Sequence, residues 1–204
     1  MRVNSFSVLV PEGRERDSGH VELNHNTVYS LKLGNHDSNR DCDALVRVDG
    51  KEVGGFRIRA GCTMVLERPG HDDGRFTFFE ANSQQGTDAG AANVVTSDRG
   101  LIQVVFKPER KRTRQQIVGD AARKGFYGEE KTCGGLRSLS SFAPQNVSAG
   151  VTGLTGKSGQ QFVNVPELDY EPNQEVTISV RLVCGRGIRE LTSTPRSNEV
   201  PVPV

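Results

Sequence analysis

Short apolar runs separated by turn-forming residues are the feature that most constrains the fold of this chain. The run at 44–48 leads directly into Asp49-Gly50, which is a strong signal for a two-residue hairpin turn. Pro69-Gly70 and Asp73-Gly74 interrupt later runs in the same way. Such spacing is typical of an antiparallel sandwich or barrel, and it predicts about seven strands within residues 1–108.

These strands are expected at 6–10, 28–33, 44–48, 56–58, 63–67, 75–79 and 100–106. Their apolar side chains are the core candidates, although a one-residue slip in register would invert which face each one occupies. The core candidates are Val28, Leu31, Leu33, Leu45, Val46, Val48, Phe56, Ile58, Phe76, Phe78, Ile102, Val104 and Phe106.

The rest of the chain changes character several times. Residues 84–98 are small and polar, which predicts a long loop with room for a helical turn, and 109–124 is the one stretch of helix-like composition. Glycine and serine dominate 128–159, and strand patterning returns at 161–165 and 175–184. We therefore predict a mainly β fold, an antiparallel β-sandwich of jelly-roll-like or immunoglobulin-like type, with one weak helix and long Gly/Ser-rich loops.

Four segments follow from this pattern. Residues 1–108 are expected to form the sandwich domain, and 109–160 a basic helix or linker with glycine-rich loops. Residues 161–192 are expected to return to the sheet. Residues 193–204 contain three prolines, which lack the donor a ladder needs, so this stretch is expected to be an extended arm.

Composition excludes several classes of protein. The 26 basic residues balance 25 acidic ones, so the chain as a whole is not a polycation for nucleic acid or membranes. No apolar stretch is long enough for a transmembrane helix, and the first residues lack the apolar core of a signal peptide. The cysteines form no C-x-x-C pair, and free thiols are favoured over a Cys42–Cys62 disulfide. We expect a cytoplasmic or virion protein.

One segment resembles a phosphate-binding loop without meeting its requirements. Gly156-Lys157-Ser158 lacks the glycine five positions upstream, where Val151 stands, and strand-like residues follow it instead of a helix. A glycine-rich turn is the expected structure, so no nucleotide or other cofactor is predicted.

Alternating oxygen side chains suggest a cation loop. Asp37, Asn39, Asp41 and Asp43 have the spacing of calcium ligands, but Cys42 stands where an EF-hand needs glycine, and Val48 where it needs glutamate. These four residues remain candidates for a looser cation site. The alternative is a turn whose side chains bond their own backbone.

No arrangement of residues marks a reaction. A nucleophilic triad needs serine or cysteine beside histidine and a carboxylate, and no sequence motif brings such residues together. His71, Asp72 and Asp73 are expected in a solvated turn between strands. We therefore predict a protein that is not an enzyme.

Two segments are candidates for binding partners. The basic stretch carries Arg110, Lys111, Arg112 and Arg114, with aromatic residues downstream, and a solvated face is favoured there over contact with nucleic acid. In the arm, Val200, Val202 and Val204 alternate with proline and fall on one side of an extended chain. We expect these valines to enter a groove of a neighbouring chain.

Three stretches, 45–54, 66–78 and 153–162, resemble β-rich proteins associated with viral particles and some microbes. This resemblance implies a structural or adhesive role and carries no catalytic residues. The predicted function is a non-catalytic structural or interaction protein of a large assembly, such as a capsid-associated or surface protein, whose partners are other protein chains, above all itself. The alternative is a glycan-binding sandwich with or without calcium, although the chain has no Trp and only three Tyr to serve as sugar platforms.

Overall fold

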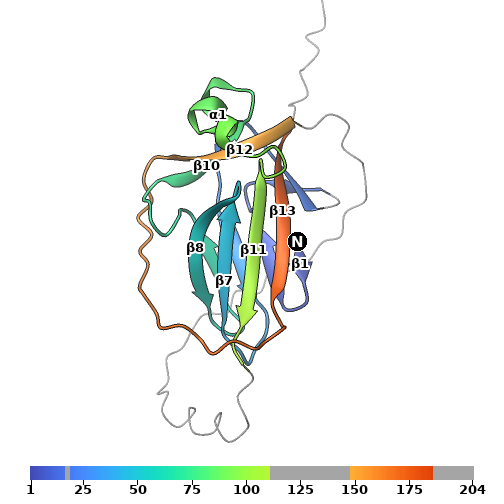
Figure 1. The fold of residues 1–204 in the computed structure, drawn as a ribbon, viewed down its shortest axis with the longest axis vertical. Coiled ribbons are helices and arrows are strands. Elements are labelled where there is room, and N and C mark those ends of the chain that lie inside the picture. The colour runs from blue at the N-terminus through green and yellow to red at the C-terminus, as the bar shows by residue number, and fades with distance from the viewer. Residues whose placement is uncertain (17–18, 111–147, 186–204) are drawn as a thin grey trace, which may run out of the picture.

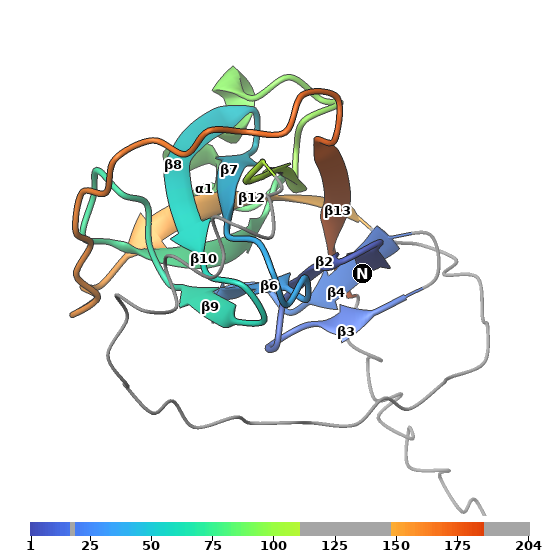
Figure 2. The ribbon, with the colours of Figure 1, turned by 90° about the horizontal axis from the view of Figure 1, so that it is seen from below.

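Two packed sheets form the molecule in the computed structural model, which describes residues 1–16, 19–110 and 148–185. Seen from below, β2, β6 and β9 lie in one layer, and β7, β8 and β13 in the other (Figure 2). The small sheet has the order β1-β2-β6-β9, and the large sheet the order β5-β10-β12-β13-β11-β7-β8, with β4 beside β13 and β3 beside β4. Among the residues that the structure describes, every strand pairing is antiparallel except that of β4 with β13. The predicted β-sandwich-like fold is confirmed.

The strands are β1 (Arg2–Val3), β2 (Phe6–Leu9), β3 (Arg14–Glu15), β4 (His20–Leu23), β5 (Thr27–Val28), β6 (Leu31–Asn35), β7 (Cys42–Val48), β8 (Lys51–Ile58), β9 (Thr63–Leu66), β10 (Arg75–Glu80), β11 (Leu101–Pro108), β12 (Ser148–Thr155) and β13 (Val176–Cys184). The helical elements are α1 (Gln84–Asp88) and the 3-10 turn η2 (Ala91–Asn93), which sit at one end of the sandwich (Figure 1). Within the described residues, no helix is long and apolar enough to span a bilayer.

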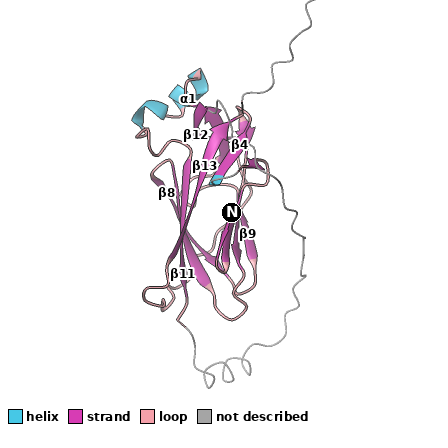
Figure 3. Ribbon diagram, turned by 90° about the vertical axis from the view of Figure 1, so that its right-hand side faces the viewer, coloured by secondary structure: helices cyan, strands magenta, loops and turns pink. Residues whose placement is uncertain are grey.

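The hydrophobic core lies between the sheets because their strands alternate inward and outward side chains. Every second residue of β11 is buried, and Phe106 from this strand stacks on Phe6 of the small sheet with ring centroids 4.8 Å apart. Figure 3 shows the two layers edge-on, with α1 above them. A second, smaller cluster packs under α1 around Phe79 and Val151.

The hairpin predicted at Asp49-Gly50 joins β7 to β8. Both residues have positive φ, 52° and 76°, as a type I′ turn requires. Asp49 also donates its backbone N–H to Leu101, so the turn is tied to the start of β11.

Most of the expected core residues are buried, and two are not. Leu45 lies on the outer face of β7, because its neighbours Ala44 and Val46 face the core. Val28 ends β5 at the margin of the large sheet. Both side chains are exposed, as the alternation of a strand dictates for a residue out of phase with the core.

The strand expected at 28–33 is two strands in different sheets. β5 pairs with β10, whereas β6 pairs with β2 and β9. Ser30 lies at the crossing, where the Glu12 carboxylate accepts both its backbone N–H and its hydroxyl. The chain therefore changes layers within a run of uniform strand character.

Residues 1–108 do not complete the sandwich. β13 lies between β11 and β12, so the second strand run after residue 160 is central to the large sheet. β12 occupies part of the region expected to be glycine-rich loops. Its glycines serve close packing: a Cβ on Gly150 would lie 2.0 Å from the Phe78 ring. β3 and β4 are also strands that the sequence pattern did not indicate.

The remaining sequence-based expectations concern the loops, the cysteines and the basic and proline-rich segments. Residues 161–165 form no strand, and 84–98 contains the expected helical turn, α1, together with the 3-10 turn η2. Cys42 and Cys62 are free thiols, and burial raises the pKa of Cys42 to about 12. The expected helix at 109–124 and the arm at 193–204 lie, apart from residues 109–110, outside the described residues.

Candidate functional site

A long surface segment links β12 to β13 and carries the first candidate surface. This segment, residues 156–175, is called the strap. It runs down the outside of β8 and returns under the sandwich to β13 (Figure 1). Apart from an isolated bridge between Tyr170 and Glu109, it belongs to no ladder. It covers the side where β8 and β9 are the outermost strands of their sheets.

At β9, the strap replaces a missing strand with a side chain. The Gln160 amide donates from Nε2 to the Val65 carbonyl at 2.6 Å and accepts the Glu67 N–H at 3.0 Å. A neighbouring strand would supply the same donor and acceptor. The Gln160 amide therefore caps the open edge of β9, which would otherwise be available to another chain.

Arginine and phenylalanine side chains hold the same part of the strap. Arg68 donates from Nε and Nη2 to the Gln160 carbonyl, at 3.0 and 2.6 Å. Its guanidinium lies 4.6 Å from the centre of the Phe162 ring, and Phe162 packs in turn on Phe56 of β8. Phe162 is thus the inward anchor of the strap.

Lower down, an ion pair fastens the strap to β7 and β8. Arg57 binds both oxygens of Asp43, at 2.7 and 2.9 Å, and donates to the Pro166 carbonyl at 2.7 Å. Tyr170 of the strap donates its hydroxyl to Asp43 at 2.7 Å. Burial alone would raise the pKa of Asp43, but the hydrogen bonds from Arg57 and Tyr170 and the positive charge of Arg57 outweigh it and lower that pKa.

Between these fastenings, two valines face solvent. Val163 is 84% exposed and Val165 is 52% exposed. They are two residues apart, so they lie on one face of an extended chain, opposite Phe162. Val163 and Val165, the strap residues with the highest strand propensity, are therefore exposed and belong to no ladder.

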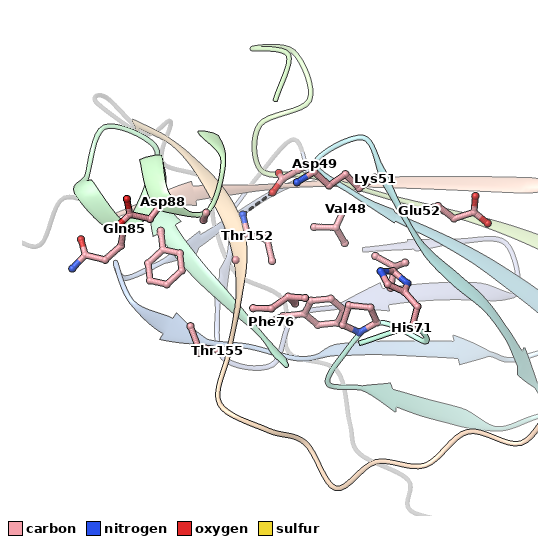
Figure 4. A pocket seen from close by; sticks show the side chains of 16 residues that line it. Val48, Asp49, Lys51, Glu52, His71, Phe76, Gln85, Asp88, Thr152 and Thr155 are labelled. Atoms are coloured by element: carbon pink, nitrogen blue, oxygen red, sulfur yellow. Dashed lines mark hydrogen bonds between the residues drawn. The ribbon is translucent and has the colours of Figure 1, made fainter. Parts of the chain in front are cut away.

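The second candidate is a cavity of about 510 Å³ at the α1 end of the sandwich. Its apolar lining comes from Val48, Val53, Pro69, Phe76 and Phe79, which are buried side chains. Its polar lining includes Lys51, Glu52, His71, Gln85, Asp88 and Thr155. Figure 4 shows Gln85 and Asp88 on one side, Glu52 and His71 on the other, and Phe76 between them.

Asp49 forms the inner wall of this cavity and is only 6% exposed. Its two oxygens accept the backbone N–H groups of Gly100 and Thr152, both at 2.6 Å. Burial raises its pKa to about 6, against the lowering effect of these two hydrogen bonds. The carboxylate joins the β7–β8 turn to β11 and β12, and thereby fixes the wall of the cavity.

The four cation-site candidates do not share a site. Asp37 binds Arg40 and the backbone of Asn39, and Asp41 accepts the Ala60 N–H. Asp43 belongs to the ion pair under the strap. In the described part of the chain, no group of three or more acidic, histidine or cysteine side chains is arranged to hold a metal ion.

The structure brings together one pair that the sequence did not indicate. Ser7 Oγ lies 2.9 Å from His36 Nε2 on the small sheet, beside Gly34, where a Cβ would come within 2.4 Å of that Oγ. Burial and the charge of Arg2 lower the pKa of His36. The nearest acid in sequence, Asp37, accepts hydrogen bonds from Asn39 and Arg40. The Ser7–His36 pair supplies two of the three groups that a nucleophilic triad needs.

No protein-family model matches this chain, and no curated protein or solved structure matches it either.

The predicted partner-binding residues fall mostly outside the described residues: this holds for Lys111, Arg112, Arg114, Val200, Val202 and Val204. Arg110 is described, and it pairs with Asp169 of the strap at 3.4 Å. The segment that resembled a phosphate loop is the end of β12 and the start of the strap, where Lys157 lies 3.4 Å from Asp73.

Sequence reasoning missed the two features that the structure makes most prominent. The cavity draws its lining from residues between Val48 and Thr155, which only the folded sheets bring together. Strand character at 161–165 was recognised, but nothing in the sequence indicated that this stretch would have no neighbour. The turn predicted at Asp49-Gly50 marked the position of the buried carboxylate, but the sequence did not indicate its burial.

Proposed function

We propose that this chain is a non-catalytic structural protein that assembles with copies of itself, pairing through the exposed part of the strap. The observation that supports this proposal is a strand-forming stretch, 161–165, that lies exposed and outside every ladder of the described chain. Addition of a strand from another chain is a common way to satisfy such a segment. The sequence resemblance to proteins of viral particles agrees with this role.

The backbone of the strap has one edge free for such pairing. The carbonyls of Gln160 and Pro166 accept hydrogen bonds from Arg68 and Arg57, so they point toward the body of the protein. Carbonyls of successive residues in an extended chain point to opposite edges, so those of residues two apart point to the same edge. We infer that the carbonyls of Val163 and Val165, which lie out of phase with these two, point outward.

A second copy fits this edge. Antiparallel pairing about Asn164 sets Val163 of one copy opposite Val165 of the other, and such apolar pairs stabilise sheets. Pro166, which has no N–H, then lies out of phase with the bonded positions, so it costs no ladder hydrogen bond. The segment is therefore complementary to itself.

The test is self-association of the full chain, measured by analytical ultracentrifugation over a range of concentrations. We expect the wild type to associate and the double variant Val163→Lys, Val165→Lys to remain monomeric, because each lysine would lie opposite a lysine of the other copy. Val95→Lys is the matched control, since Val95 is 67% exposed and lies beside η2, away from the strap. A wild type that stays monomeric at every concentration, or a double variant that associates as well as the control, contradicts the proposal.

A further inference from the structure

The cavity at the α1 end offers a ligand two kinds of surface at once. Val53, Phe76 and Phe79 supply an apolar floor, and Gln85 and Asp88 face Glu52 across it (Figure 4). A volume of about 510 Å³ is within the range of sites for small ligands. The ligand that fits such a site has an apolar face and a polar edge.

The charges around the cavity restrict the ligand further. Asp49, Glu52 and Asp88 are acidic, and Lys51 is the basic residue of the lining. The resulting negative potential disfavours phosphates and carboxylates. Amide, hydroxyl and carboxylate groups together offer both donors and acceptors, which suits a ligand rich in hydroxyl groups.

Two polar side chains of the lining, Asp88 and Thr152, are held by hydrogen bonds. Ser83 caps α1 by accepting the Gly86 N–H at 2.9 Å, and Gln84 donates to the Asp88 carboxylate at 3.0 Å. The hydroxyl of Tyr29, which is buried beneath the lining, lies 2.7 Å from Thr152 Oγ1. A site whose side chains are already ordered loses less entropy when a ligand binds.

We propose that this cavity binds a neutral saccharide, whose ring face packs on the apolar floor while its hydroxyl groups bond Gln85, Asp88 and Glu52. A pyranose ring has the required form, because its C–H groups line one face and its hydroxyls project from the edge. The binding is separate from strap pairing, since no residue of the strap lines the cavity.

The experiment titrates the ¹⁵N-labelled full chain with glucose, galactose, mannose and N-acetylglucosamine, each up to about 50 mM, since single-sugar affinities in the millimolar range are expected for a few hydrogen bonds. At least one neutral sugar is expected to shift the amide signals of Gln85, Asp88 and Thr155 saturably. Glucose 6-phosphate is expected to bind more weakly than glucose, because of the acidic rim.

Variants at the rim separate site binding from other contacts. Gln85→Ala with Asp88→Ala should weaken the affinity roughly tenfold or more, because hydrogen bonds to a charged group contribute strongly. Asn82→Ala, an exposed residue just before α1 that does not line the cavity, should leave it unchanged. Absence of saturable shifts with every sugar, equal binding of the phosphorylated sugar, or an unchanged affinity in the double variant would overturn the proposal.

Discussion

Residues 161–165 of the strap and β13 both have the apolar pattern of a strand, but only β13 joins a sheet. In β13, Ile178, Val180 and Leu182 are buried, and the strand pairs with β11, β12 and β4. In the strap, Phe162 alone among residues 161–165 packs against the core, and Val163 faces solvent. Strand propensity is therefore realised only where a neighbouring strand and a core face are both present.

The two regions also differ in what holds them. β13 is stabilised by burial of large apolar side chains, each of which contributes on the order of 2 kcal/mol. The strap is held chiefly by hydrogen bonds from Arg57, Arg68 and Gln160 to backbone groups, each with a net contribution of about 1 kcal/mol. We expect the strap to detach under conditions that leave the sandwich folded.

The largest effect on stability is expected from truncating a buried side chain of β13. Ile178→Ala should lower the free energy of unfolding by about 2–5 kcal/mol, because the side chain is fully buried between strands that cannot close the space. Val163→Ala in the strap should change it by less than about 0.5 kcal/mol. Urea unfolding of both variants measures the difference, and similar losses for the two would show that the strap is as integral to the fold as β13.

The next largest effect is on the pH dependence of stability, to which Asp49 and Asp43 contribute with opposite sign. Because the pKa of Asp49 is raised to about 6 from 3.8, the folded state binds its proton more tightly than the unfolded state does. This contribution to stability is present below pH 4 and is lost as the pH rises through 6. For a shift of this size, the free energy of unfolding that is lost is about 3 kcal/mol. Asp43, under the strap, has a lowered pKa, so its contribution is present above pH 4 and is lost in acid.

Asp49→Asn isolates the first of these contributions. Asparagine tolerates the positive φ of the turn and removes the titration. Unfolding free energies at pH 4, 5, 6 and 7 should therefore fall more steeply for the wild type than for this variant. Parallel curves for the two proteins would mean that Asp49 titrates alike in the folded and unfolded states.

The sequence was informative where local chemistry decides the structure. Asp49-Gly50 requires positive φ and therefore identified the hairpin, and the period of two in residues 101–106 identified the inward face of β11. Partners distant in sequence could not be read in the same way. The crossing at Ser30 depends on Glu12, and the strand nature of 148–155 depends on Phe78, for which the glycines make room.

The candidate surfaces were less predictable for the same reason. Whether residues 161–165 become a strand depends on the edge of β8. There the contact with the strap is made by the Arg57 side chain, which donates to the Pro166 carbonyl, and not by a backbone ladder. The cavity depends on Asp49 being bonded by residues about 50 and 100 positions further along the chain, Gly100 and Thr152. Pairings at such separations leave no local pattern in a single sequence.

The smallest effect expected is also the most specific test of how the strap is held. Tyr170→Phe removes the hydroxyl that donates to Asp43 but leaves both bonds from Arg57, so no buried charge loses its partner. The free energy of unfolding should fall by about 1 kcal/mol or less. Amide exchange at residues 166–171 should nevertheless quicken, because the Tyr170 hydroxyl bond and the bridge to Glu109 fasten this stretch together.

Hydrogen exchange followed by mass spectrometry measures this change, with peptides from β13 as the internal reference. Val165→Ala serves as the control, because it alters the exposed face of the strap and none of its fastenings. Faster exchange in the strap with unchanged exchange in β13 places the two regions in separate opening units. Faster exchange in both would mean that the strap and the sandwich open together, and that the ion pair under the strap is part of the core's cooperative unit.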